Sequence, residues 1–225
     1  TALLRSVAEQ LKTPLALIAR QAELGQLLGD MRAIDVVSIR TQATTALSLV
    51  ECYLLGLQLW HEQSELALEP VSVSSLLVEV AHELDGFAKQ CDIGLELRIA
   101  GRYEPAIAHA RGLRSALLSL GYALLENYPA ENKTLTLALH RTPHGLVTGI
   151  YGDYHSLCSQ QWRQALRLQG MARQPFRALT SGSGAGLFVA QAILQAMATR
   201  LRVGKHLHQF GLATTLQASQ QLRFV

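Results

Sequence analysis

Apolar residues recur every three or four positions along the first third of the chain, which is the spacing of one face of a helix. Between residues 4 and 28 they fall at Leu4, Val7, Leu11, Ile18, Leu24 and Leu28. Pro14 interrupts this run, and we expect it to kink the helix because proline removes a backbone donor and crowds the preceding turn. Gly29 and Asp30 predict a turn.

A second amphipathic helix is predicted from about residue 31 to about residue 64. Its apolar side chains follow heptad spacing at Val36, Ala43, Leu47, Val50, Leu54 and Leu57, and Gly56 is the one weak position. Two long helices with a short connection cannot bury an apolar stripe alone. We therefore predict an antiparallel hairpin that pairs with a second copy as a dimeric four-helix bundle. The alternative is one hairpin packed on its own C-terminal domain.

After Pro70 the pattern changes to shorter, mixed periods. It predicts strands at residues 71–73, 94–99, 134–140, 145–151, 200–205 and 212–219, and helices at residues 74–90, 113–127 and after a glycine-rich segment at 182–187. Segregated helices and mostly antiparallel strands are typical of an α+β sandwich. We therefore divide the chain into a helical hairpin, residues 1–66, and a second domain, residues 67–225.

Composition narrows the functional classes. The 225 residues are 49% hydrophobic and 16% charged, with a net charge of +3 and no dense Lys/Arg run, which argues against a nucleic-acid partner. Cys52, Cys91 and Cys158 lie far apart, which fits a reducing compartment without disulfides. No apolar run is long enough to span a membrane. Because the chain begins at Thr1, inside a predicted helix, we expect a cytoplasmic protein or the cytoplasmic part of a larger membrane-attached sensor.

One segment of the first helix is a candidate for chemistry. Residues 9–14 read Glu-Gln-Leu-Lys-Thr-Pro, and an apolar run follows. This resembles the phosphoacceptor box of sensor histidine kinases, which usually reads His-Glu-Leu-Lys/Arg-Thr-Pro. Glu9 stands at the position of the acceptor histidine, and Gln10 at that of the acidic neighbour that assists transfer. A carboxylate cannot replace the imidazole nucleophile, so we expect Glu9 to be inactive as an acceptor.

The resemblance implies roles for the neighbouring residues and for the rest of the chain. Lys12 and Pro14 would face a docking partner. Thr13 would position a water that dephosphorylates a response regulator, or would cap the backbone freed by Pro14. Residues 69–77 resemble the linker into the ATP-binding domain of this family. The implied second domain is an α/β sandwich of the histidine-kinase, gyrase and Hsp90 ATPase type.

Four sequence boxes hold the nucleotide in that family. In this chain the glycine-rich box matches the family pattern, whereas the asparagine box does not. Gly182, Gly184 and Gly186 match the glycine-rich box, where small residues at a helix start let backbone amides approach a phosphate. The two asparagine positions fall on Ser119 and Ala123. Alanine offers no oxygen to Mg²⁺, so we expect no metal there. Asn127 lies a full turn out of register.

The other two boxes are also altered. Asp153 matches the residue that reads adenine, but both following glycines are absent, and Tyr154 or His155 would fill the space of an adenine ring. Arg177, in the lid segment, would meet a phosphate or stay solvated. We therefore expect weak ATP binding or none and no cofactor, with ATP and Mg²⁺ required only if the chain is a working kinase.

Two histidine patterns are open to misreading. Residues 82–84, His-Glu-Leu, repeat the start of an acceptor box without the Thr-Pro, and we interpret them as coincidence. His140, His144, His206 and His208 suggest metal binding, but no Cys or carboxylate lies at ligand spacing. We expect these histidines to be solvated.

The interpretation that unites these observations is a degenerate histidine-kinase core. We expect a homodimeric pseudokinase that signals by binding a response regulator or another kinase, with Glu9 as a fixed negative charge. One alternative is an active kinase or a response-regulator phosphatase using Thr13. Another is a phosphotransfer protein with a decayed ATPase domain, although the first helix has no acceptor histidine. A gyrase-type or anti-sigma ATPase module fits poorly with the long hairpin.

Overall fold

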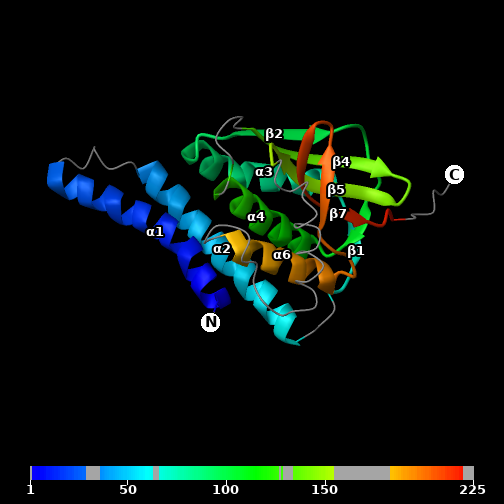
Figure 1. Cartoon of the computed structure of the whole chain (residues 1–225), viewed down its shortest axis with the longest axis horizontal. Helices are drawn as coiled ribbons and strands as arrows, with labels where there is room; N and C mark the ends of the chain where they lie inside the picture. Colours follow the sequence, from blue (N-terminus) through cyan, green and yellow to red (C-terminus); the bar gives the residue numbers. More distant parts are fainter. Residues whose placement is uncertain are drawn as a thin grey trace.

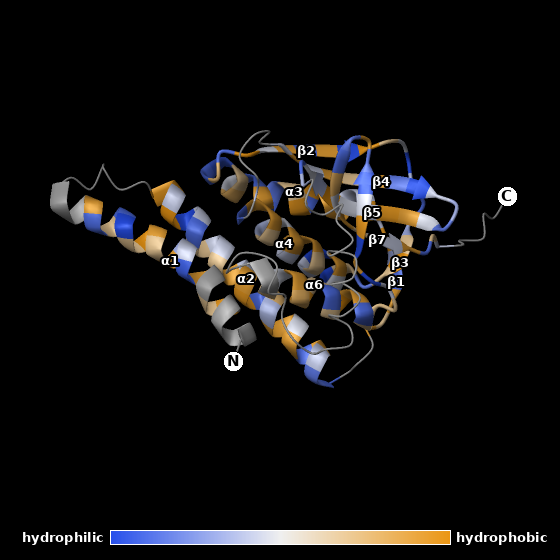
Figure 2. Cartoon of the chain, viewed as in Figure 1, coloured by the Kyte–Doolittle hydropathy of each residue, from blue (hydrophilic) through white to orange (hydrophobic). Residues whose placement is uncertain are grey.

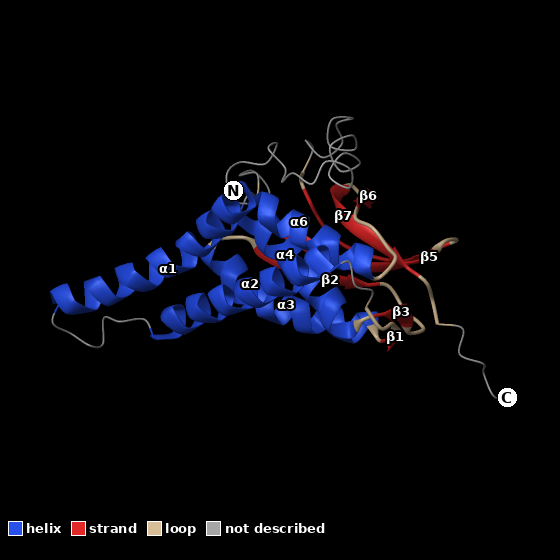
Figure 3. Ribbon diagram, turned by 90° about the horizontal axis from the view of Figure 1, so that it is seen from below, coloured by secondary structure: helices blue, strands red, loops and turns tan. Residues whose placement is uncertain are grey.

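The structure is a computed structural model that describes residues 2–28, 36–62, 66–126, 128, 134–154 and 183–219. Its helices are α1 (Ala2–Leu28), α2 (Val36–Glu62), α3 (Val73–Gln90), α4 (Ala110–Glu126) and α6 (Ser183–Ala196). Its strands are β1 (Glu69–Val71), β2 (Gly94–Ile99), β3 (Ala106–Ala108), β4 (Thr134–Thr142), β5 (Gly145–Gly152), β6 (Arg202–His206) and β7 (Gln209–Leu216). Three layers result: a sheet, the helices α3, α4 and α6 on one face of it, and the α1–α2 hairpin outside them (Figures 1 and 3).

The main sheet has the strand order β2-β4-β5-β7-β6. Strands β2 and β4 are parallel and all other neighbours are antiparallel. Leu137, Ile150 and Leu212 lie in one row across β4, β5 and β7 and are buried against the helices. This arrangement confirms the predicted α+β sandwich. Strand β3 was not predicted; it is only three residues long and forms a separate small sheet with β1.

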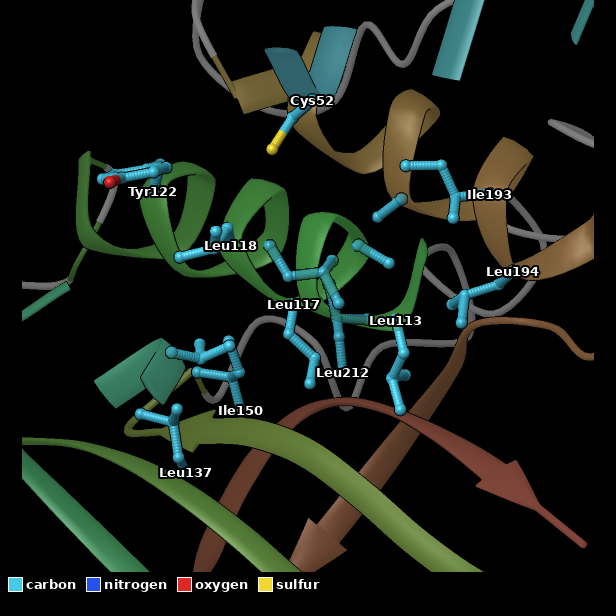
Figure 4. Close-up of a cluster of buried hydrophobic side chains, with 14 of the residues drawn as sticks. Cys52, Leu113, Leu117, Leu118, Tyr122, Leu137, Ile150, Ile193, Leu194 and Leu212 are labelled. Atoms are coloured by element: carbon cyan, nitrogen blue, oxygen red, sulfur yellow. The ribbon is translucent and has the colours of Figure 1, made fainter. Parts of the chain in front are cut away.

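Helix α4 is buried on all sides. Every residue from 115 to 125 is buried. The side chains of α4 meet the strands on one side, and Cys52 of α2 approaches from the other (Figure 4). A helix covered by two layers has no solvated face.

The hairpin packs on its own C-terminal unit. Helices α1 and α2 contact each other and both contact α6, and α2 also contacts α4 and α3. The buried residues of α2 are Gln42, Thr45, Leu49, Cys52, Tyr53, Gly56 and Leu59. Four of these belong to the same hydrophobic core as the sheet and α4: Leu49, Cys52, Tyr53 and Leu59. The hairpin is therefore packed on its own C-terminal domain, which was the alternative to a hairpin buried only by a second copy.

Most of the stripe predicted for α2 lies on the other side of the helix, whereas its last member, Leu57, packs against the core. Val36, Leu47 and Leu54 are 67%, 65% and 64% exposed. Helix α2 therefore has two apolar faces. The heptad spacing identified mainly the face that is exposed to solvent in this chain. Figure 2 shows hydrophobic residues recurring along the hairpin.

Close packing explains the glycine at position 56. A Cβ on Gly56 would lie 2.7 Å from Cγ1 of Val189 in α6. One turn later, the rings of Trp60 and Phe188 meet edge to face at 5.0 Å between centroids. Glycine permits this approach at some cost in helix propensity.

Element ends differ from the predictions by a few residues. Helix α1 continues through Pro14, and α2 is described from Val36, so the start predicted near residue 31 lies outside the described residues. The predicted turn at Gly29 and Asp30 lies outside the described residues. The strand predicted at residues 71–73 lies at Glu69–Val71, because Ser72 caps α3: its Oγ accepts a bond from the Ser75 amide at 3.4 Å. None of the described helices has the length and hydropathy of a membrane span.

Candidate functional site

The acceptor-like box lies in the first half of α1. Lys12 and Thr13 are exposed, whereas Pro14 is buried and Leu11 partly buried. Glu9 lies one turn before Thr13 on the same helix. Lys12 and Thr13 are therefore accessible to a partner. The buried ring of Pro14 packs inside the molecule, so its predicted docking role has no support in this placement.

The region of the adenine-reading box is occupied by two tyrosines. Tyr154 is 5% exposed, and its hydroxyl donates to the carbonyl of Leu124 at 2.6 Å. Its ring meets that of Tyr128 edge to face, with centroids 5.1 Å apart. The Tyr128 hydroxyl donates to the Thr134 carbonyl at 2.7 Å and accepts from the Asp153 amide at 3.2 Å. These bonds tie the end of β5 to the end of α4 and the start of β4.

The two rings leave no room over the backbone before Asp153. A Cβ on Gly152 would lie 2.7 Å from Cε2 of Tyr128 and 2.9 Å from Cε2 of Tyr154. Burial raises the pKa of both tyrosines, so both hydroxyls remain protonated donors at neutral pH. Asp153 is thus held at an aromatic plug, which we define as Tyr128 and Tyr154. The sequence pointed to Tyr154, but Tyr128 had no motif to identify it.

The glycine-rich and asparagine boxes contact each other directly. A Cβ on Gly186 would lie 2.7 Å from the carbonyl oxygen of Ser119 and 3.0 Å from Cβ of Ala123. Gly186 therefore serves the packing of α6 on α4. Gly184 lies in the first turn of α6, and Gly182 and Arg177 lie outside the described residues.

Helix α2 covers the α4 face that bears the asparagine positions. Cys52 is 2% exposed and points toward α4 (Figure 4). Burial raises the pKa of the Cys52 thiol, and hydrogen bonding with Ser119 and Ser115 opposes this in part. A buried protonated thiol is unreactive, so Cys52 is a packing residue.

A hydrogen bond to a charged carboxylate joins the hairpin to the second unit. Glu83 of α3 accepts a bond from Oγ of Ser48 in α2 at 2.5 Å and is paired with Arg114 of α4. Glu83 is mostly buried, so both partners offset the cost of desolvating its charge. No sequence motif points to this role, because both partners lie more than thirty residues from Glu83.

The histidines predicted to be solvated fall into two pairs. His144 and His208 are exposed in turns, as expected. His140 and His206 instead stack on each other with ring centroids 5.0 Å apart, which corrects the prediction for this pair. Within the described part of the chain, no three potential metal ligands gather.

Comparisons with known proteins identify the fold. No protein-family model and no curated protein matches the chain. Among solved structures, the Acinetobacter baumannii histidine kinase AdeS is 15% identical, with 93% of this chain and 98% of AdeS covered and a TM-score of 0.56. Full-length ShkA in complex with AMPPNP is 20% identical over 84% of this chain, with a TM-score of 0.58, and this chain spans 39% of its length. The catalytic domain of the histidine kinase ThkA is 9% identical over 68% of this chain and 97% of that domain, with a TM-score of 0.53.

These likenesses are at the level of the fold. They confirm that the chain has the fold of a sensor histidine kinase catalytic core, as its sequence boxes suggested.

Proposed function

We propose that this chain is a two-component signalling protein that has kept the kinase fold without the kinase reaction. It acts as a pseudokinase by binding a response regulator or another histidine kinase. The observation that supports this most is the aromatic plug: the buried Tyr154 bonds to Leu124 and packs on Tyr128 beside Asp153. An adenine ring there would have to displace two packed tyrosines.

Changes at two further positions support the same conclusion. Ala123 has no side-chain oxygen for a cation, and its Cβ lies against Gly186. Glu9 replaces the nucleophile of phosphohistidine formation. The structural neighbour ShkA was solved with AMPPNP, so this fold can hold a nucleotide. In this chain the nucleotide site and the acceptor position have both changed, which favours lost catalysis over one variant residue.

Titration calorimetry with ATP and Mg²⁺ tests the proposal. We expect no binding heat at nucleotide concentrations up to the millimolar range, because binding would unpack the aromatic plug. An ATP-binding histidine kinase core serves as the positive control, and circular dichroism verifies that the sample is folded. Binding in the micromolar range would contradict the pseudokinase function.

The exposed stripe of α2 supports a homodimer. Leu47, Val50 and Leu54 recur on its solvent side, and Leu15 and Leu17 of α1 are also exposed. A second copy would bury these side chains in a four-helix bundle while each hairpin stays docked on its own second unit. We infer that the dimer acts in the cytoplasm, in line with the QseC neighbour, which is a cytoplasmic segment.

Replacing Glu9 by Gln is expected to weaken binding of the partner receiver domain about tenfold, since a hydrogen bond to a charged group is worth about 1.5–3 kcal/mol. Binding is measured by biolayer interferometry against a panel of receiver domains. The matched control is Glu23→Gln, which removes the same charge from an exposed position of α1. Equal affinities for the wild type and Glu9→Gln would show that the receiver domain does not recognise the charge at position 9.

The exposure of Thr13 favours one alternative, a response-regulator phosphatase. A phosphorylated receiver domain distinguishes it: the pseudokinase leaves the phosphoryl group in place, and a phosphatase releases it. Labelled ATP separates the remaining alternatives. Label appears on the chain only if it is an active kinase, and a phosphotransfer protein takes label only from a phosphorylated partner.

A further inference from the structure

The face of the sheet away from the helices has a small core of its own. Ala138, Tyr151 and Ala213 form a separate buried cluster there, and Tyr151 is 0% exposed. Although β7 lies between β6 and β5 in the sheet, a Cβ on Gly204 of β6 would lie 3.4 Å from Cε1 of Tyr151 in β5. Because the sheet curls in this way, residues of β6 reach side chains that flat pairing would keep two strands away.

Two histidines close this outer core. His140 of β4 and His206 of β6 stack with centroids 5.0 Å apart and an interplanar angle of 29°. The His206 ring also lies 5.3 Å from the ring of Tyr151. Nδ1 of His140 is buried without a hydrogen-bond partner. This contact connects β6 to β4, which is not its neighbour in the sheet.

The surroundings of the pair disfavour positive charge. On β2, Arg98 donates to Glu96 at 3.0 and 2.8 Å, so this carboxylate is already paired. Arg202 and Lys205 lie on β6, and the Lys205 ammonium is 5.6 Å from the Phe210 ring centroid. Among the described strands packed here, β5 contributes the neutral phenol of Tyr151, and β7 contains no charged residue.

Both imidazoles are therefore neutral at neutral pH. Burial lowers the pKa of His140. Burial lowers the pKa of His206 as well, and His140 and Arg98 lower it further. Both rings are half-buried, so a proton on either would be only partly solvated, and the described strands named above offer it no unpaired carboxylate.

We propose that His140 and His206 form a proton-operated latch, in which the neutral stack holds the edge strand β6 over the outer face of the sheet and protonation of either ring releases β6. The cation formed on one ring loses the stack with its neighbour and becomes fully hydrated when β6 moves away. The chain would thereby respond to mild acidification at a site far from the acceptor-like box.

Thermal unfolding at pH 7.5 and pH 5.5 tests the latch. A histidine whose pKa is lowered by folding binds more protons when unfolded, so its contribution to stability is present above about pH 6.5 and is lost as the pH falls toward the folded value. We expect the melting temperature of the wild type to fall by at least about 3 °C more than that of the double variant His140→Gln/His206→Gln. The control, His144→Gln/His208→Gln, changes two exposed histidines and should behave as the wild type. An equal fall in both double variants would overturn the latch.

Measurements on the wild type keep the test independent of how the variants fold. Imidazole resonances in proton NMR should place the titration midpoints of His140 and His206 below the ordinary value of about 6.5. Amide exchange, corrected for its intrinsic pH dependence, should speed up in β6 at pH 5.5 while β4 and β5 keep their protection. Ordinary midpoints, or unchanged protection of β6, would refute the proposal.

Discussion

Replacing Gly186 by Val is expected to destabilise the protein by about 3 kcal/mol or more, or to prevent folding. A Cβ at this position would lie 2.7 Å from the carbonyl oxygen of Ser119. That oxygen belongs to the backbone of α4, which is buried between the sheet and α2 and cannot move aside. Helix α6 would have to shift away from α4, and the core between them would open.

Denaturant unfolding followed by circular dichroism measures this effect. The control is Gln195→Ala, an exposed position of α6 that should stay within about 0.5 kcal/mol of the wild type. Gly186→Ala should fall between the two. An unchanged unfolding midpoint for Gly186→Val would mean that the α4–α6 contact is not as close as described. The glycine would then be explained better by the nucleotide-binding role that the sequence resemblance implies.

A fragment of residues 67–225 is expected not to fold cooperatively, although the sequence marks it as a separate domain. The hairpin contributes Leu49, Cys52, Tyr53 and Leu59 to the shared core, and α4 would lose the cover on one of its two buried sides. The exposed apolar surface should bind the dye ANS, and the thermal transition should broaden or disappear. A sharp transition at the wild-type temperature would establish residues 67–225 as an independent domain.

A point variant of the full chain tests in the same way whether the hairpin contributes to the core. Leu59→Ala should cost about 2–4 kcal/mol, the usual range for a buried leucine whose site cannot collapse. Gln58→Ala, at the exposed neighbouring position, should have little effect. Equal stabilities would show that the hairpin is not part of the core.

Part of the candidate site was predictable from the sequence. Residues 9–14 pointed to a histidine-kinase core, and the structure comparisons confirmed that fold. Tyr154 was expected to fill adenine space, and it lies buried beside Asp153. Its partner Tyr128 could not be found in this way, because it lies outside every box and is placed only when α4, β4 and β5 meet.

Hydrophobic spacing within single segments was enough to predict most of the helices and strands. The strand predicted at residues 94–99 is β2, and the periods of α1, α3, β4 and β5 placed those elements within a few residues. Hydrophobic spacing reports which residues share a face, because that depends only on the rise and turn of the backbone.

Which partner each face meets depends on how the elements pack in three dimensions. This packing buried the Leu49 face of α2 and left the Leu54 face exposed, and it turned Gly186 into a helix contact. It also brought His206 across the sheet to His140. These contacts join residues far apart in the chain, and their geometry follows from the stacking of layers and the curl of the sheet, which no local spacing encodes.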